Sequence, residues 1–274
     1  MAENKSKDRI ELYKVCILYG LCYMLIVLVF GGKIKMYINP HYTWLTIFAI
    51  IVIFLMAMVQ TRKVLQSLSE SHKHDHHRSS VWSLFPFLVP LVFAFMLPNS
   101  TLSADLASKR GIDIGSSSTA ATSPITNSPS SQNSNYPTSP SNLGGADKDH
   151  DYSLDNTLTL TDDNFVNILN QIYAAPQKFN GKEISMTGFV ARDSDFSKTQ
   201  FGLVRYVIVC CTADAMPGGF LCELEHADSY KDGTWLQIKG TLGMDKFRGM
   251  DTVVARINSL QTVKAPDSPY VYPY

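Results

Sequence analysis

The sequence predicts two structural classes in one chain: an N-terminal α-helical membrane anchor with three transmembrane helices, and a small C-terminal β-barrel of the OB type with one leading helix. Three observations predict this division. They are three uncharged apolar stretches near the N-terminus, a polar low-complexity stretch after them, and a series of strand-like segments near the C-terminus. We expect a membrane domain over 1–104, a disordered tether over 105–150 and an extracytoplasmic barrel domain over 151–274.

The uncharged stretches are residues 15–32, 36–61 and 79–104, which contain 18, 26 and 26 residues. An apolar helix of about 20 residues crosses a bilayer core of about 30 Å. A secretory signal is the alternative for the first stretch, but no small-residue cleavage site follows its apolar run. We therefore expect three retained membrane helices and contact with the lipid bilayer.

Basic residues predict the orientation, because cytoplasmic loops carry an excess of Lys and Arg. Eight of them would share a side with the N-terminus: Lys5, Lys7, Arg9, Lys14, Arg62, Lys63, Lys73 and Arg78. Four would lie on the opposite side: Lys33, Lys35, Lys109 and Arg110. This asymmetry predicts a multi-pass cell-membrane protein with a cytoplasmic N-terminus and an extracytoplasmic C-terminal domain.

The stretch from Gly111 to His150 is rich in Ser, Thr, Asn, Pro and Gly and offers little to bury, which is typical of a disordered tether. Order is expected to resume with an amphipathic helix that Thr161 caps and Pro176 ends. Its apolar positions are Phe165, Ile168, Leu169 and Ile172.

Five strand-like segments follow, at residues 182–190, 203–211, 219–225, 234–242 and 251–263. A helix and five short strands fit a small closed barrel of the OB type, and an SH3-like barrel would have nearly the same pattern. Gly188 and Gly240 fall inside strand patterns, where glycine usually marks a bulge or a tight barrel corner.

The segment "VCCTADA" places Cys210 and Cys211 at the end of an apolar segment, followed by Asp214. Adjacent side chains on a regular strand point to opposite faces, so the two cysteines can bind one ion only if the strand ends at Cys210 and a turn begins at Cys211, which the following "TADAMPGG" permits. Three interpretations stay open: buried small side chains, a disulfide with Cys222, or a thiolate zinc site. That site would comprise Cys210, Cys211, Cys222 and Asp214, with Glu223, Glu225 or His226 as further ligands.

The segment "SHKHDHHRS" lies between the second and third apolar stretches and concentrates four imidazoles: His72, His74, His76 and His77. Neutral imidazoles at this density can bind zinc, nickel or copper ions. The alternative is a solvated polar loop, since no rigid scaffold is evident.

Several function classes lack support in the sequence. It contains no nucleophile elbow, phosphate-binding loop or H-E-x-x-H motif, so we expect no enzymatic activity and no catalytic residues. The formal net charge is zero and the bases of the barrel domain alternate with acids, so we expect no nucleic-acid partner.

Five sequence elements together carry a resemblance to a known family: "LSADLASKRGIDI", "NGKEISMTGFV", "RYVIVCCTADA", "GTWLQIKGTL" and "SPYVYPY". With them the chain resembles a Gram-positive family of subunits of two-component membrane permease complexes, over nearly its whole length. The CC-x-A-D-A element beside Arg205 is the most specific part of the resemblance.

The resemblance implies an accessory subunit whose partner is a separate multi-span membrane permease, with no established substrate and no catalytic residues. We accordingly expect a non-enzymatic subunit whose extracytoplasmic barrel docks on that permease. A freestanding membrane-anchored surface sensor, or a metallochaperone that uses thiols and histidines, remains the alternative.

Overall fold

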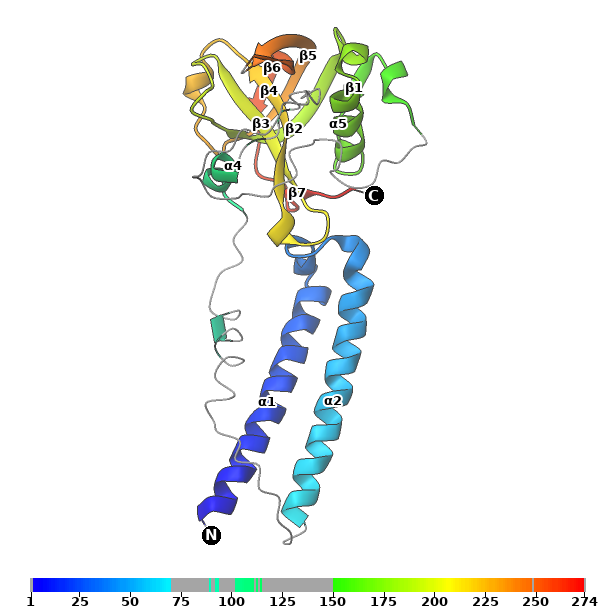
Figure 1. The fold of residues 1–274 in the computed structure, drawn as a ribbon, viewed down its shortest axis with the longest axis vertical. Coiled ribbons are helices and arrows are strands. Elements are labelled where there is room, and N and C mark those ends of the chain that lie inside the picture. The colour runs from blue at the N-terminus through cyan, green and yellow to red at the C-terminus, as the bar shows by residue number, and fades with distance from the viewer. Residues whose placement is uncertain are drawn as a thin grey trace, which may run out of the picture. The chain divides into compact units, whose positions relative to one another are not determined.

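The computed structural model describes residues 2–69, 89, 92–93, 102–110, 112, 114, 150–247 and 249–273. The chain divides into two compact units, Met1–Ser100 and Thr101–Tyr274 (Figure 1). The histidine-rich segment, nearly all of the third apolar stretch and most of the expected tether lie outside the described residues.

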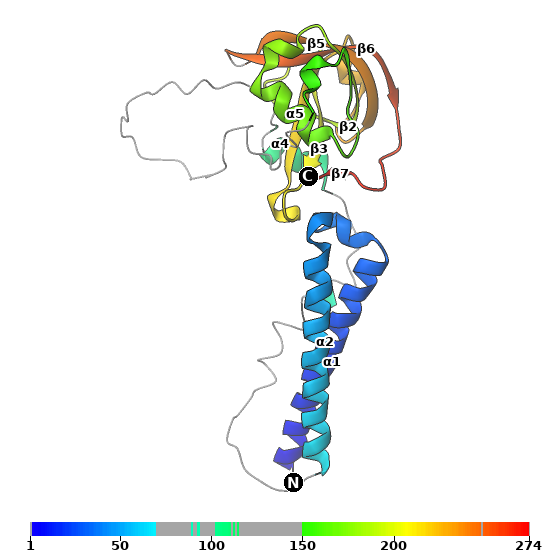
Figure 2. The same cartoon turned by 90° about the vertical axis from the view of Figure 1, so that its right-hand side faces the viewer.

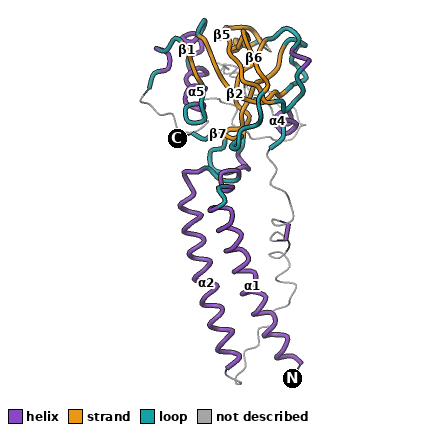
Figure 3. The backbone as a smooth tube through the Cα atoms, turned by 180° about the vertical axis from the view of Figure 1, so that it is seen from behind, coloured by secondary structure: helices purple, strands orange, loops and turns teal. Residues whose placement is uncertain are grey.

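The first unit contains two long helices, α1 (Ala2–Phe30) and α2 (Thr43–Ser69), joined through the short 3-10 helices η1 (Lys33–Met36) and η2 (Pro40–Tyr42). The two long helices pack side by side (Figures 1 and 3). Within the described residues, two segments are long and apolar enough to cross a membrane, Glu11–Phe30 and Pro40–Gln66. Two of the three expected membrane helices are therefore present as helices of suitable length and composition, and the third lies largely outside the described residues.

Polar contacts join the N-terminal half of α1 to the C-terminal half of α2, so the helices run antiparallel. The Glu11 carboxylate pairs with Lys14 at 2.6 Å and accepts a hydrogen bond from Gln60. Farther along, the Tyr19 and Phe54 rings meet edge to face with centroids 6.4 Å apart. Most aliphatic and aromatic side chains of the pair face outward, which suits a lipid or protein environment.

The second unit is built on a seven-stranded sheet, whose strands are β1 (Thr157–Thr159), β2 (Glu183–Ala191), β3 (Gln200–Val207), β4 (Met216–Glu223), β5 (Trp235–Phe247), β6 (Met250–Thr262) and β7 (Tyr270–Val271). The strand order is β1-β2-β5-β6-β4-β3-β7, and a further pairing of β2 with β3 closes β2 to β6 into a barrel (Figure 3). All contacts around the barrel are antiparallel except that between β4 and β6. The expectation of a five-stranded barrel is confirmed, whereas the short parallel edge strands β1 and β7 were not foreseen.

Glycines allow the strands to approach each other closely. Gly240 lies at the register shift between β5 and β6, where an added Cβ would sit 2.4 Å from the Arg256 carbonyl oxygen. At Gly188, an added Cβ would lie 2.8 Å from the Val204 carbonyl oxygen. Gly240 matches the expected bulge, whereas at Gly188 the register with β5 is unbroken and the structure shows only a close approach of the β3 backbone.

Helix α5 (Phe165–Ala174) packs on the barrel and contributes apolar side chains to its main core (Figure 2). It ends before Pro176, as expected. The expected cap at Thr161 is wrong, because the helix begins after Asn164. The Asn164 side chain turns back instead, and its oxygen accepts a hydrogen bond of 2.7 Å from the Thr161 backbone N–H.

The second unit begins earlier in the chain than the expected boundary at 151. Helix α4 (Ala104–Arg110) contacts β2 and β4, and Ile114 packs with Phe247 and Val254 in a second small core. The apolar residues Ile112 and Ile114 explain the difference, since they give this part of the expected tether something to bury. The described residues between 105 and 114 therefore belong to the barrel unit.

Candidate functional site

The site that the structure assembles from the residues expected to bind metal is the loop between β3 and β4, residues 208–215, here called the cysteine loop. Strand β3 ends at Val207, whose register partner is Met216 at the start of β4. The expected strand over 203–211 is therefore wrong at its end, because its last four residues leave the ladder with β4. Strict alternation of side chains no longer applies to Cys210 and Cys211.

The Asp214 carboxylate shapes the cysteine loop. It accepts backbone hydrogen bonds from Val209 at 3.1 Å, from Cys210 at 2.7 Å and from Cys211 at 3.3 Å. In return, the Asp214 N–H donates to the Cys211 carbonyl at 3.0 Å, which closes the short 3-10 helix η7 (Thr212–Asp214). One side chain thus replaces the ladder partners that these N–H groups lost at the end of β3.

This turn brings two consecutive thiols into contact. The sulfur atoms of Cys210 and Cys211 lie 3.6 Å apart, with Cys210 exposed and Cys211 partly buried. Both sulfurs and an oxygen of Asp214 lie within 4.8 Å of one another. Three donor atoms of the kinds that bind divalent metals therefore converge on one short loop.

The charge at this loop argues against a reactive nucleophile. The Asp214 carboxylate, hydrogen-bonded to the thiol, raises the pKa of Cys210 to about 12, and the neighbouring Cys211 adds to the effect. Catalytic cysteines need the opposite, a pKa lowered by a positive environment. Cys210 is therefore a protonated thiol at neutral pH.

Cys222 lies elsewhere. It is fully buried in β4 among the main core residues, and its thiol contacts the Phe220 carbonyl oxygen at 3.7 Å. Burial raises the pKa of this thiol to about 12. Cys222 is a free cysteine and is absent from the group of converging donor atoms in the described part of the chain.

The other ligands considered lie at the far end of β4 from the cysteine loop. Glu223 ends that strand and pairs with Arg256 at 3.5 Å. Glu225 and His226 follow in the connection towards β5. The histidines expected to bind metal, His72, His74, His76 and His77, fall outside the described residues.

Arg205 lies in β3, three residues before the cysteine loop, and has a structural role that the sequence did not predict. Its side chain is 4% exposed and pairs with Asp162 at 2.6 Å. The guanidinium also donates to the carbonyl oxygens of Ser268 (3.0 Å), Pro269 (3.3 Å) and Tyr270 (3.4 Å) and lies over the Trp235 ring. The signal available in the sequence was a lone charge inside an apolar strand, which is rarely buried unless paired.

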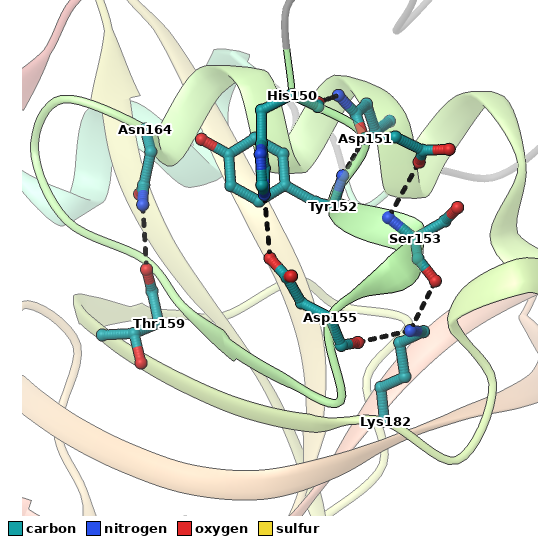
Figure 4. A network of polar contacts seen from close by, with 9 residues as sticks. His150, Asp151, Tyr152, Ser153, Asp155, Thr159, Asn164 and Lys182 are labelled. Atoms are coloured by element: carbon teal, nitrogen blue, oxygen red, sulfur yellow. Dashed lines mark hydrogen bonds and ion pairs between the residues drawn. The ribbon is translucent and has the colours of Figure 1, made fainter.

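A polar network holds residues 150–155 against helix α5 and the start of β2 (Figure 4). Lys182 donates to the backbone carbonyls of Ser153, at 2.7 Å, and Asp155. His150 contacts the Asp155 carboxylate at 3.1 Å, and the Gln171 amide of α5 donates to the His150 carbonyl at 2.7 Å. The adjoining cavity of about 230 Å³ is small and open, so we assign this region to structural support.

A larger cavity of about 410 Å³ lies where residues 102–105 cross the barrel. Tyr206 donates to the Ser103 carbonyl at 2.8 Å, and the Leu102 N–H donates to the Tyr270 hydroxyl at 2.9 Å. Two tyrosines thereby hold the end of the third uncharged stretch, Leu102 and Ser103, on the barrel. The Asp232 carboxyl at this cavity has a raised pKa because of burial, although Arg192 opposes the shift.

Comparisons with known proteins agree with this two-part architecture. Residues 13–113 match the DUF1980 N-terminal domain, and residues 137–273 match the DUF1980 C-terminal domain. The chain is 27% identical over 292 residues to UPF0703 protein YcgQ of Bacillus subtilis, covering 95% of this chain and 99% of that protein.

A second relative, from Streptococcus mutans, is named "Putative two-component membrane permease complex subunit". The identity is 23% over 252 residues, covering 88% of this chain and 92% of that protein. The resemblance expected from the five sequence elements is thereby confirmed. Because the matched domains extend over most of its length, the chain belongs to the DUF1980 family.

Proposed function

We propose that this protein is a non-enzymatic accessory subunit of a membrane permease complex. The observation that carries the proposal is the similarity, over 88% of the chain, to a relative named as a subunit of such a complex. The aligned region includes both parts of the chain, so we assign the helix pair and the barrel to the same proposed subunit.

The helix pair supports a partner in the membrane. Along α1 and α2, large apolar side chains such as Phe48 and Leu55 are exposed, while small or polar residues such as Ala57 and Cys22 fill the contact between the helices. A two-helix unit with such faces needs lipid or further helices around it. Residues 15–30 and 43–61 carry no Asp, Glu, Lys or Arg, so the pair offers no charged relay of its own.

The proposed orientation places the N-terminus and the histidine-rich segment in the cytoplasm and the barrel outside the cell membrane. Antiparallel packing supports part of this, because Lys14, Arg62 and Lys63 lie at the same end of the helix pair. Labelling with a membrane-impermeant maleimide, in a cysteine-free background with single cysteines at Ser79 or Ser130, tests it. We expect reaction at Ser130 alone, and reaction at Ser79 alone would reverse the topology.

The barrel is the part that we propose docks on the permease. Its closed five-stranded order, with one parallel contact between β4 and β6, supports an OB-type class. Acids alternate with bases along its strands, as in the β5 segment "MDKF", so a protein surface suits it better than nucleic acid.

Photo-crosslinking in cells tests the accessory role. A photoreactive residue at Phe48 or Leu55, which are 60% and 52% exposed, should join the chain to a multi-span membrane protein that mass spectrometry identifies. Ala57, which is 0% exposed within the helix pair, is the matched control position and should give no such product.

The complementary measurement is purification of the intact chain in gentle detergent. We expect a multi-span protein to co-purify in a fixed ratio. Recovery of the chain alone, together with crosslinks at Phe48 and Leu55 only to lipid or to a second copy, would contradict the permease role and favour the freestanding sensor.

A further inference from the structure

We propose that Cys210 and Cys211 chelate one exchangeable divalent cation of the zinc class. The inference concerns the barrel unit alone and does not rest on the permease partner. It starts from the 3.6 Å contact between two thiols, one exposed and one partly buried, and from a carboxylate oxygen within 4.8 Å of both sulfurs.

The distance between the two sulfur atoms favours tetrahedral over linear coordination of a shared metal ion. Two thiolates bound to zinc at about 2.3 Å with a tetrahedral angle lie about 3.8 Å apart. Linear two-coordinate binding with the same bond length would separate them by about 4.6 Å. The observed 3.6 Å requires almost no movement for a tetrahedral chelate and an opening of the loop for a linear one.

Asp214 preorganises the chelate. Its carboxylate accepts hydrogen bonds from the backbone N–H groups of Val209, Cys210 and Cys211, and these bonds fix the turn that brings the two thiols together. We assign it as a positioning residue whose carboxylate can also serve as a third ligand.

With three donors or fewer from the described part of the chain, at least one tetrahedral position stays open to water or to a carrier molecule. Closed structural zinc sites have four protein ligands, so an open site is suited to exchange. On binding, two S–H bonds break, two metal–sulfur bonds form, and two protons pass to solvent.

A disulfide between the two cysteines is the competing use of this pair. Disulfides usually join Cα atoms about 4.4–6.8 Å apart, whereas consecutive Cα atoms across a trans peptide are about 3.8 Å apart. The direct bond would therefore be strained, and a bridging ion fits the backbone better. Burial, the third use of cysteine, does not apply to the exposed Cys210.

Metal titration of the intact chain tests the inference. The chain is purified in detergent and reduced, with His72, His74, His76 and His77 replaced by Ser to remove their imidazoles. Cadmium then serves as the probe, because its thiolate complexes absorb in the ultraviolet, and zinc is measured by competition. We expect one ion per chain, a thiolate absorption band and the release of two protons.

Variants locate the site. Cys210→Ser and Cys211→Ser should each remove the band and lower zinc affinity at least tenfold, whereas Cys16→Ser, at the other exposed cysteine, should change neither. Asp214→Ala should lower affinity about 10- to 100-fold, the usual cost of losing an orienting partner. Its circular dichroism must match that of the parent chain for this comparison.

Two results would overturn the proposal. One is the absence of a thiolate band in the reduced parent chain. The other is equal zinc affinity in the parent chain and in the Cys210→Ser and Cys211→Ser double variant, once circular dichroism has shown that this variant keeps the fold.

Discussion

Replacing Arg205 with Met tests whether one buried cation holds the C-terminal segment onto the barrel. The methionine keeps an apolar stem of similar length but removes the charge and all donors. Three consecutive carbonyls, those of Ser268, Pro269 and Tyr270, would lose the N–H groups that now contact them. The Asp162 carboxylate, which is 58% exposed, would simply return to water.

The expected cost follows from these contacts. Hydrogen bonds to charged groups contribute about 1.5–3 kcal/mol each, but three bonds from one side chain are not additive, and one of them is long. Removing a partner from a buried charge pair costs about 3–5 kcal/mol, and the exposure of Asp162 favours the lower end. We therefore expect a loss of about 3 kcal/mol in the free energy of unfolding.

Urea unfolding of the intact chain in detergent measures this loss. Trp44 and Trp82 are replaced by Phe, so that Trp235, whose ring lies 5.6 Å from the Arg205 guanidinium, is the only indole reporter. With a urea dependence of about 1–3 kcal/mol/M, the midpoint should fall by about 1–3 M.

Two further variants make the Arg205 test sharp. Arg205→Lys should recover only part of the loss, because an ammonium cannot reproduce the planar set of donors. Arg256→Met is the matched control, since the Arg256 side chain is 57% exposed and its pair with Glu223 at 3.5 Å should contribute less than about 1 kcal/mol. Equal midpoints for Arg205→Met and Arg256→Met would refute the reasoning.

Three other predictions address separate contacts. Lys182→Met should destabilise the barrel unit by about 1–3 kcal/mol and speed amide hydrogen exchange over residues 150–155. The control Lys178→Met, at an exposed position, should do neither. Unchanged exchange in Lys182→Met would contradict the assigned support role. Gly240→Ala should cost more than Gly202→Ala, because its Cβ would lie 2.4 Å rather than 3.3 Å from a backbone oxygen, and the reverse order in urea midpoints would refute this. The pKa of Cys222 is raised from 9.0 to about 12, so the unfolded chain loses this proton first as pH rises above 9. Between pH 8 and pH 10 the parent should therefore lose about 1.4 kcal/mol more stability than Cys222→Ala, and parallel pH profiles would contradict the burial effect.

The sequence predicted the parts of the fold that depend on local pattern. Apolar stretches without charges gave the two described membrane-type helices, and alternating segments gave the five barrel strands. Gly188 and Gly240 were informative because a missing Cβ has a direct meaning inside a strand. In contrast, β1 and β7 are two or three residues long and are strands only because β2 and β3 lie beside them. Such short segments carry no pattern of their own.

The sequence predicted three residues of the candidate site, but neither the end of β3 nor the separation of Cys222 from the others. Cys210, Cys211 and Asp214 were named from sequence, and they converge because β3 ends at Val207. Nothing in the apolar run "VIV" predicts that end, since Ile208 and Val209 favour strand as strongly as the residues before them. Cys222 was grouped with the others because a hairpin neighbour can lie close in space, but the register pairs it with Phe201 instead.

The hydrogen bond between the Ile208 N–H and the Val271 carbonyl, just after the end of β3, connects Arg205 to the cysteine loop. Arg205 fixes residues 268–270, and this places the Val271 carbonyl where it accepts a hydrogen bond of 3.0 Å from the Ile208 N–H. Beyond Ile208, the next three N–H groups turn to the Asp214 carboxylate rather than to a strand. The two charged side chains therefore support neighbouring parts of the chain. Arg205 holds the segment whose Val271 carbonyl accepts the hydrogen bond from Ile208, and Asp214 accepts the hydrogen bonds of the three residues that follow. Arg205 and the CC-x-A-D-A element, which are neighbours in the sequence, thus supply two anchors that adjoin each other in the structure.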